Sequence, residues 1–359
     1  MIFEKCLFYF QTNTMKIHIS VFFFLTIACN AFHFVTRRWD FGDYHETIDA
    51  LAVDNGNLFL SRNNKMQWLR PMVDKPIVHL TRDFPRIINR LSIKKKAILV
   101  NLAPDNARSV SETLVFSNGK CCRVAWKDNT MYEALVEQNG YVLRSNFFGN
   151  ITYGNHDNLF TYNTRVYTNF SYSAMVVYGN HLWCATEFKT MNNTRMTRID
   201  AFDLFVKLNG SDHDYISSVP DMSFLVENKG CVHPCQLCVS VEKHHPKNIV
   251  YLIVGYMIGG VNVAQAFFPT EKKFTYTMCS KLPNERHVRS MSWDKPYLFF
   301  LDEEGISAYK IFPRMDLHQY MGKYKLPTKY FSETTQIVSI KRQVFWNGEE
   351  SLYSAQVVE

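Results

Sequence analysis

The sequence has no apolar run long enough to cross a membrane and little concentration of charge. Its longest apolar run, Ile249–Ile258, contains Gly255 and stops at Gly259-Gly260. A membrane-spanning helix needs about 20 apolar residues, so we expect no stable membrane insertion of the mature chain. The net charge is only +7 over 359 residues, and Lys94–Lys96 is the one compact basic run. We therefore expect solvated basic side chains, with a weak affinity for acidic polymers such as sulfated glycans as the alternative, and no nucleic-acid partner.

Enzyme signatures are also missing. The sequence contains no G-x-S-x-G nucleophile elbow, no H-E-x-x-H zinc helix, no P-loop and no dinucleotide fingerprint,. We therefore favour a protein that is not an enzyme, and we assign no catalytic residue and no cofactor. Calcium is the one metal with a candidate segment, Ser211–Asp214, because calcium binds several oxygen ligands. The same residues are typical of a polar surface loop, which is the interpretation we prefer.

Two short motifs are given structural interpretations. The acidic run Asp302-Glu303-Glu304 is interpreted as the solvated edge of a turn, because neighbours in a turn rarely hold two carboxylates at a catalytic separation. The dipeptide Trp293-Asp294 matches the letters of a WD repeat. We place it in the turn before a strand, and not at the end of one, and assign it no role.

What the sequence does contain begins with a pattern typical of a secretory signal. From Met15 onward, Lys16 precedes the apolar run Ile19–Ala28. The small residues Cys29 and Ala31 follow at positions −3 and −1 of a cleavage site. A charged start, a short apolar stretch and a small-residue site together indicate export.

These features predict a signal peptide over residues 1–31 and a single domain over residues 32–359. Met15 is the alternative start of the protein. An uncleaved signal anchor is the alternative interpretation of the apolar run. Cleavage would make the mature protein secreted and extracellular.

Export to an oxidising compartment favours disulfides. Of nine cysteines, Cys6 and Cys29 leave with the signal, and seven remain: Cys121, Cys122, Cys184, Cys231, Cys235, Cys238 and Cys279. The spacing from Cys231 to Cys238, followed by His244-His245, would indicate zinc in a reducing compartment. Here we predict disulfides, and the odd number leaves at least one thiol free or paired with another chain. The connectivity stays open.

Four sequons agree with export. The N-x-[ST] pattern occurs at Asn150, Asn169, Asn192 and Asn209,. All four lie within residues 150–211. We therefore predict a glycoprotein with one glycosylated sector.

Short apolar runs separated by turns recur along the chain. In Leu51–Trp68 apolar residues alternate at period two across two turns rich in Asn, which is the signal of β-hairpins,. Similar arrangements occur at Met175–Thr186 and Ser290–Ile311. In all three copies five positions separate an apolar residue before the turn from a leucine after it: Val53 and Leu58, Val177 and Leu182, Trp293 and Leu298. Looser copies lie at residues 113–126, 238–256 and 337–358.

Several strands in these copies are apolar on both faces, as in Leu58-Phe59-Leu60. Such strands must lie between two layers. Aromatic residues, which favour strands, make up 15% of the chain,. The one helical candidate is Asp200–Leu208, which also fits an outer strand.

Four-strand units at this spacing resemble the blades of a β-propeller, the architecture of several secreted repeat proteins. The resemblance implies an all-β chain with a single propeller of six or seven blades, each of about 45–50 residues. It also implies that the C-terminal strand closes the ring by joining the first blade. A tandem of β-sandwich domains is the alternative.

Two functions fit these patterns. The first is a secreted glycosylated propeller that acts as a binding or interaction module for an extracellular protein, a glycan or a small ligand, with the contacts on its loops. In this it looks like sema-type ectodomain modules and the yellow/royal-jelly-type insect proteins. The alternative is a propeller-based hydrolase with a calcium-dependent site in the central channel, collected from several blades. We favour binding.

Overall fold

A computed structural model describes the chain between residues 33 and 358. The described ranges are 33–39, 48–54, 56–70, 77–84, 88–94, 97–102, 112–117, 120–125, 132–138, 141–146, 151–155, 164–166, 170, 172–204, 206–207, 214–215, 219–244, 247–267, 274–276, 278–283, 286–312, 318–326, 335–348 and 351–358. All of them belong to one unit, Phe32–Val358. The predicted signal peptide lies outside the described residues. None of the described residues belongs to a helix with the length and apolarity of a membrane span.

The described ranges form β-strands, and seven of their sheets contain four or five strands each. We number these sheets as blades in chain order. Blades 1 to 3 are β2 (Ile48–Asp54), β3 (Asn57–Arg62), β4 (Lys65–Arg70) and β5 (Ile77–Asp83); β6 (Ile88–Lys94), β7 (Ala97–Leu102), β8 (Glu112–Ser117) and β9 (Lys120–Ala125); and β10 (Tyr132–Gln138), β11 (Tyr141–Asn146), β12 (Ile151–Asn155) and β13 (Thr164–Val166).

Blades 4 to 7 follow the same plan with two additions. They are β14 (Ala174–Tyr178), β15 (His181–Lys189), β16 (Arg195–Asp203), β19 (Met222–Glu227) and a fifth strand, β23 (Phe274–Tyr276); β20 (Val232–His244), β21 (Lys247–Ile258), β22 (Val261–Phe267) and β24 (Met278–Lys281); β25 (Ser290–Asp294), β26 (Tyr297–Leu301), β27 (Gly305–Lys310) and β28 (Gln319–Lys325); and β29 (Ile337–Ile340), β30 (Gln343–Asn347), β31 (Leu352–Val358) and β1 (His33–Trp39). A two-stranded sheet of β17 (Val206–Lys207) and β18 (Asp214–Tyr215) lies between β16 and β19 in sequence.

The spacing of five residues found in the sequence is the register of a hairpin. Val53 pairs with Leu58, Val177 with Leu182, and Trp293 with Leu298, each across an antiparallel pair. In each case one further pair closes a turn of two residues, which is the commonest hairpin connection. The turns use residues that suit them: Gly56 and Gly179 have φ of 74° and 63°. The repeat inferred from sequence is therefore the first hairpin of a blade.

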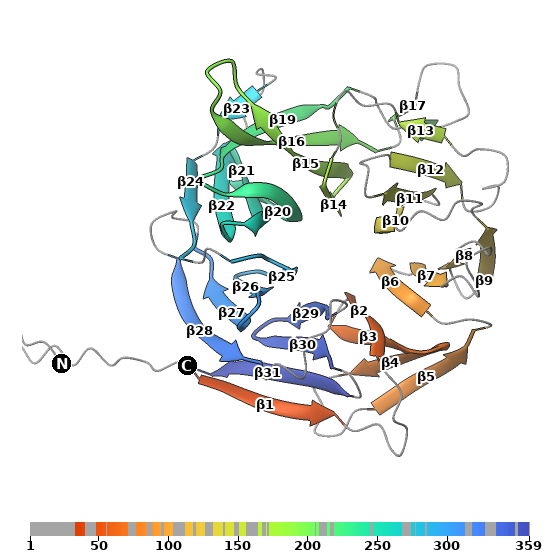
Figure 1. The fold of residues 1–359 in the computed structure, drawn as a ribbon. Coiled ribbons are helices and arrows are strands. Elements are labelled where there is room, and N and C mark those ends of the chain that lie inside the picture. The colour runs from red at the N-terminus through yellow and green to blue at the C-terminus, as the bar shows by residue number, and fades with distance from the viewer. Residues whose placement is uncertain are drawn as a thin grey trace, which may run out of the picture. The chain divides into compact units, whose positions relative to one another are not determined.

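The seven blades form a ring. The first strand of each blade contacts the first strand of the next, and β29 contacts β2, so the first strands make a closed circle around the centre (Figure 1). This is the β-propeller that the sequence predicts, with seven sheets in the described part of the chain. It excludes the tandem β-sandwich, in which two sheets would cover each other and no circle would form.

The ring is closed by the other end of the chain from the one that we expected. The sequence predicts that the last strand joins the first blade. Instead β1, the first strand, pairs antiparallel with β31 and becomes the outermost strand of blade 7, from His33↔Val358 to Trp39↔Leu352. The two ends of the domain are thus held together by a complete strand pair. Trp39 strengthens it, because its indole Nε1 donates a 2.9 Å hydrogen bond to Ser354.

Strand direction divides the ring into two faces. The four successive strands of a blade alternate in direction, whereas the added β23 runs parallel to β19. Short links such as the one from β19 to β20 connect the fourth strand to the next first strand. All first strands therefore point the same way. The turns between first and second strands lie on one side, here called the first-turn face. The turns between second and third strands lie on the other, the second-turn face.

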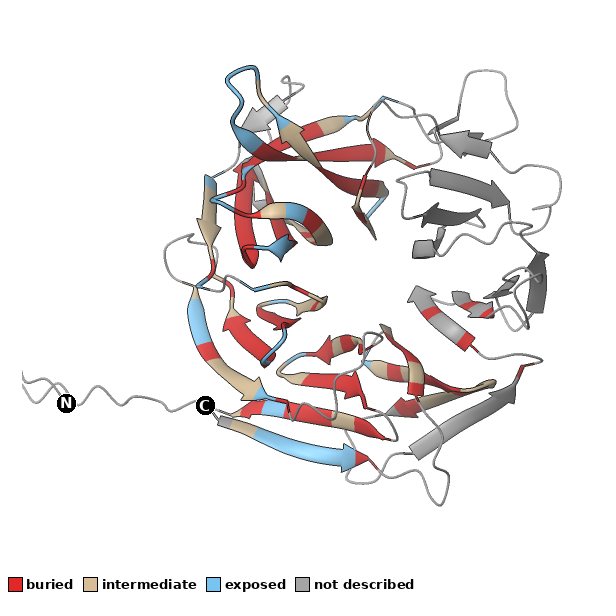
Figure 2. Ribbon diagram, in the orientation of Figure 1, coloured by how far each residue is buried: buried red, intermediate tan, exposed pale blue. Residues whose placement is uncertain are grey.

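Each blade buries both of its sheet faces. Strand β26 is buried at all five positions. Its side chains alternate between two clusters: Leu298 and Phe300 pack with blade 5, while Phe299 and Leu301 pack with blade 7. Burial runs along the inner strands of the described blades (Figure 2). Because a buried Phe or Leu side chain contributes about 1.5–3 kcal/mol, neighbouring blades are what stabilise each sheet.

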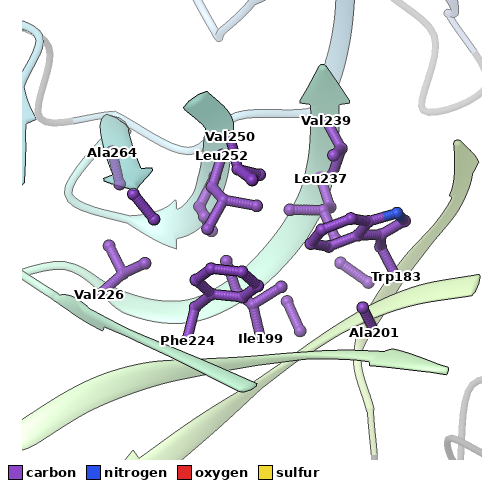
Figure 3. Close-up of a cluster of buried hydrophobic side chains, with 14 of the residues drawn as sticks. Trp183, Ile199, Ala201, Phe224, Val226, Leu237, Val239, Val250, Leu252 and Ala264 are labelled. Atoms are coloured by element: carbon purple, nitrogen blue, oxygen red, sulfur yellow. The ribbon is translucent and has the colours of Figure 1, made fainter. Parts of the chain in front are cut away.

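The largest cluster joins blades 4 and 5. Trp183 and Phe224 stack at 5.8 Å between ring centroids and face Leu237, Val250 and Leu252 of the next blade (Figure 3). All five side chains are buried. The two aromatic rings thus fill space between adjacent sheets, and each buries a large apolar surface,.

The helical candidate Asp200–Leu208 is a strand for its described part. Asp200 to Asp203 complete β16, the third strand of blade 4, and Val206 begins the short β17. The side chains alternate with the period of two that is typical of a strand. Ile199 and Ala201 pack in the cluster with blade 5, while Phe202 and Leu204 pack in a separate cluster.

Candidate binding surface

The first strands of blades 6 and 7 are joined by a ladder of side chains. Ser290 and Ser292 of β25 accept hydrogen bonds from the backbone N–H groups of Ile337 and Ser339 of β29, at 3.2 and 2.9 Å. Asp294 accepts one from the N–H of Lys341 at 2.6 Å. Every pair is 47 residues apart, so the two strands run in parallel without a direct sheet connection.

The ladder follows from period two. Alternate residues of β25 point to opposite sides. Met291 and Trp293 therefore pack with blade 5, while the polar residues between them reach blade 7. Alternate N–H groups of β29 point away from β30. These would be unpaired at a sheet edge, and the β25 side chains satisfy them. The ladder thereby fixes the height of the blade 7 turn relative to blade 6.

Cations in these first turns are seated over tyrosines of the preceding blade. Arg342, in the turn of blade 7, donates from Nε to the Tyr297 hydroxyl at 2.6 Å, and its Cζ lies 5.4 Å from the ring centroid. Lys295, in the turn of blade 6, has its Nζ 5.0 Å from the Tyr251 centroid and pairs with Glu242. Partial burial lowers the pKa of Lys295. Each contact limits the freedom of a long side chain.

The first-turn face of blades 6 and 7 is consequently positive. Lys341 is exposed, with Arg342 next to it. Lys310 ends β27 opposite Tyr297, which places it at the same end of blade 6. On blade 4 the positive surface stops: His181 contacts Asp221 at 3.3 Å and Asp203 at 3.9 Å.

The second-turn face of blade 6 holds carboxylates and cations that pair with one another. Asp302 is buried and accepts from the N–H groups of Glu304 and Gly305 and from Lys323 Nζ at 2.8 Å. Glu304 pairs with Lys323 and Arg286, and the hydrogen bond from Lys323 lowers the pKa of Glu304. The interpretation of this run as a solvated edge is therefore wrong for Asp302, whose carboxylate caps the turn from inside.

The placement of Trp293-Asp294 is corrected as well. Both residues belong to β25 and end it, whereas the sequence placed them in the following turn. The turn itself is Lys295-Pro296, because Asp294 pairs with Tyr297. Trp293 packs between blades 5 and 6, and Asp294 belongs to the ladder.

A second polar cluster lies inside blade 4. The Asp200 carboxylate, fully buried, accepts from the Tyr172 hydroxyl at 2.6 Å, from Arg198 Nε at 2.8 and 3.0 Å, and from Ser223. Burial, with the charge of Asp200, raises the pKa of Tyr172, so its hydroxyl remains a donor. Arg198 Cζ lies 4.2 Å over the Phe170 ring. The cluster joins three segments of one blade, and we interpret its role as stabilising that blade.

The predicted disulfide cysteines fall at separate places in the fold. No disulfide joins two of the five described cysteines. Cys184 is buried in β15, and burial raises its pKa. The thiol of Cys231 donates to Gly259 O at 3.1 Å and that of Cys235 to Val288 O at 3.3 Å. Burial raises the pKa of Cys238 and Cys279 to about 12. Cys121 and Cys122 lie in β9, with side chains outside the described set, and the disulfides stay a prediction.

One of the predicted glycosylation sites is described. Asn192 is exposed at the tip of the β15–β16 hairpin, where Thr190 and Thr194 exchange backbone and side-chain hydrogen bonds. Asn150, Asn169 and Asn209 lie outside the described residues. So does most of the calcium candidate, of which only Asp214 is described, in β18. Within the described ranges no three His, Cys, Asp or Glu side chains are grouped to hold a metal ion.

Sequence motifs alone did not reveal the cations of the first turns. Lys341 and Arg342 stand in one of the looser repeats, where hydrophobic spacing draws attention to the strands. A usable signal exists nonetheless. Aligning the hairpins of blades 6 and 7 by their turns places Lys295-Pro296 over Lys341-Arg342, so the sequence carries basic residues at equivalent positions.

No family model matches the chain, and no curated protein matches its sequence. Solved structures match its shape. Hsv2 of Kluyveromyces lactis has a TM-score of 0.54 at 11% identity, covering 88% of this chain and 98% of that one. YCF48 of Cyanidioschyzon merolae has 0.50 at 8%, covering 89% and 98%. The extracellular domains 1-2 of Drosophila Semaphorin 1a have 0.50 at 7%, covering 88% and 86%. All three are propellers.

The chain has the β-propeller fold. At these identities the likeness concerns the fold alone,. The blades supply a scaffold on which residues of the two faces are presented.

Proposed function

We propose that this protein is a secreted, glycosylated β-propeller that binds an extracellular partner through its first-turn face. The observation that carries the proposal is the anchoring of the Arg342 side chain on Tyr297 and of the Lys341 backbone by Asp294. Exposed cations are ordinarily mobile, and immobilising them on binding costs about 0.5–1.5 kcal/mol per side chain. Here Tyr297 of the preceding blade already orders the Arg342 side chain, and Asp294 fixes the backbone from which the Lys341 side chain extends. A surface prepared in this way is suited to recognition.

Export is supported by the signal-like segment within residues 1–31 and by the position of Asn192. An oligosaccharide at the tip of the β15–β16 hairpin projects into solvent from the second-turn face. It therefore leaves the first-turn face uncovered. The adjoining Met191 is fully exposed, and a glycan beside it would shield this apolar side chain from water,.

Glycosylation gives a direct prediction. When the full chain is expressed in secretory cells, Asn192→Gln should remove one N-linked glycan, seen as a step in electrophoretic mobility that glycosidase treatment abolishes. Asn193→Gly is the matched control, because it keeps the sequon and suits the φ of 62° at that position,. Identical mobility of wild type and Asn192→Gln would contradict use of this site.

The binding function is tested with the full chain carrying a C-terminal tag. The protein should be recovered from the medium of expressing cells, with residues 1–31 removed. It should then bind cell surfaces saturably in a titration followed by flow cytometry. Retention inside the cell would contradict secretion. Binding that rises linearly without saturation would contradict a specific partner.

A further inference from the structure

The cations of blades 6 and 7 are spread along the first-turn face. Lys341 and Arg342 belong to one turn, and Lys295 and Lys310 belong to the blade before it. The preceding hairpin, β20–β21, has Lys243 and Lys247 near its turn, since His244 pairs with Lys247 and Lys243 with Asn248. Basic residues therefore stand at the first-turn end of three successive blades.

Two described carboxylates on this face, Glu242 and Asp294, offset part of the charge of the four described cations of blades 6 and 7. Glu242 pairs with Lys295, and Asp294 accepts a backbone N–H from Lys341. The other described carboxylates of blade 6, Asp302, Glu303 and Glu304, lie at the second-turn end, where Asp302 and Glu304 pair with cations. Cations therefore outnumber carboxylates among the described residues at the first turns of blades 6 and 7.

From this arrangement we infer that the first turns of blades 6 and 7 bind a linear sulfated polysaccharide. The inference rests on the proposed extracellular function and names its partner. A single phosphate or sulfate would need several donors converging on one point. Here the cations instead follow one blade after another, which matches a polymer whose anionic groups repeat along its length. Several weak contacts to one polymer chain then raise the overall affinity, because after the first contact forms the others are intramolecular.

The donor chemistry fits sulfate. A guanidinium has five N–H donors in a planar fork, and the hydrogen bond from Arg342 to Tyr297 uses one of them while fixing the plane,. Lys341 adds a compact charge beside it. Binding that depends on such exposed charges weakens as salt rises, because ions screen them and condensed counterions are released.

The test uses heparin as the probe and the full secreted chain. The variant Lys341→Asn/Arg342→Gln removes two charges from the first-turn face, and Asn suits the φ of 54° at position 341,. The matched control is Lys229→Asn/Lys325→Gln. It removes two exposed cations from the second-turn face, and Lys229 likewise has a positive φ, of 50°.

We expect wild type and control to bind heparin at 0.15 M salt, and the first-turn variant to bind roughly tenfold more weakly. Its affinity should depend less steeply on salt, with the slope of log K against log salt reduced by about one to two units. Hyaluronate, a linear polymer with carboxylates and no sulfate, should bind weakly. Circular dichroism and the thermal midpoint should be unchanged in both variants.

Three results would overturn the inference: no retention of wild type on heparin, equal losses in the two variants, or equal affinity for hyaluronate. The proposed binding function is tested separately from this inference. Saturable cell-surface binding that survives heparinase treatment would reject the sulfated polysaccharide and leave a binding module. Absence of any saturable binding would reject both.

Discussion

Phe299 and Phe300 are adjacent in β26, and they test whether each blade depends on both of its neighbours. Both side chains are completely buried. Phe299 packs with blade 7 and Phe300 with blade 5. In an ordinary half-solvated sheet one of two consecutive residues would face water, and its truncation would cost little. In this ring both truncations must be costly.

The expected loss of unfolding free energy follows from the complete burial of the two side chains. Truncating a fully buried Phe to Ala removes its transfer free energy and leaves a cavity, which together cost about 3–5 kcal/mol. Phe300 also stacks on Tyr309, with centroids 5.7 Å apart and an interplanar angle of 16°. Such a pair adds about 0.5–1.5 kcal/mol. We therefore expect both Phe299→Ala and Phe300→Ala to destabilise within this range, with Phe300→Ala the more costly.

The assay is urea unfolding followed by tryptophan fluorescence, with the free energy of unfolding taken from the midpoint and slope. Met191→Ala is the control, because this exposed side chain should change stability by less than about 0.5 kcal/mol,. If an alanine variant does not fold, the Phe→Leu pair provides the comparison at smaller cost. A loss below about 1 kcal/mol at either alanine variant would refute packing on both faces.

Two further predictions concern the buried Asp200 cluster and two partly buried thiols. Asp200→Asn should destabilise blade 4 by about 3–5 kcal/mol in the same assay, because Arg198 loses its buried counter-charge,. Tyr172→Phe removes one hydrogen bond and should cost about 1–3 kcal/mol,. If Tyr172→Phe cost as much as Asp200→Asn or more, the central role of the carboxylate would be contradicted. In the reduced protein, Cys238 and Cys279 should react slowly with iodoacetamide at pH 8, because burial raises the pKa of each to about 12. A raised folded-state pKa contributes stability that is present below about pH 9 and lost as pH rises towards 12, so the urea midpoint should fall between pH 9 and 11. Rapid labelling at pH 8, or a midpoint that is flat with pH, would contradict this.

Local spacing made the blade predictable. A two-residue turn forces a fixed register, so Val53 and Leu58 had to pair once both lay in strands. Strands apolar on both faces, such as Leu298–Leu301, had to lie between layers. These constraints act over a few residues, which is why the sequence expresses them directly. Together they give the repeat, the all-β class and the ring.

Long-range choices were not visible in the same way. Either chain end can complete the last blade, and the choice of β1 rests on its pairing with β31 across the whole length of the domain. The burial of Asp302 was also missed, because Lys323, its partner, is contributed by the next strand but one. A hydrophobic pattern predicts that an acidic turn is solvated. That the Asp302 carboxylate points inward is visible only from its contacts in the folded chain.

The ladder explains why a surface can be built into the first turns without disturbing the ring. A first strand has no sheet partner on its inner edge, so its N–H groups need other acceptors. Ser290, Ser292 and Asp294 supply them, and the last rung lies at the turn itself. The position of Lys341 is therefore set by its backbone, which leaves its side chain outside the packing. The side chain at position 341 can then carry charge for a partner, because the hydrogen bond from its backbone N–H to Asp294 does not depend on what that side chain is.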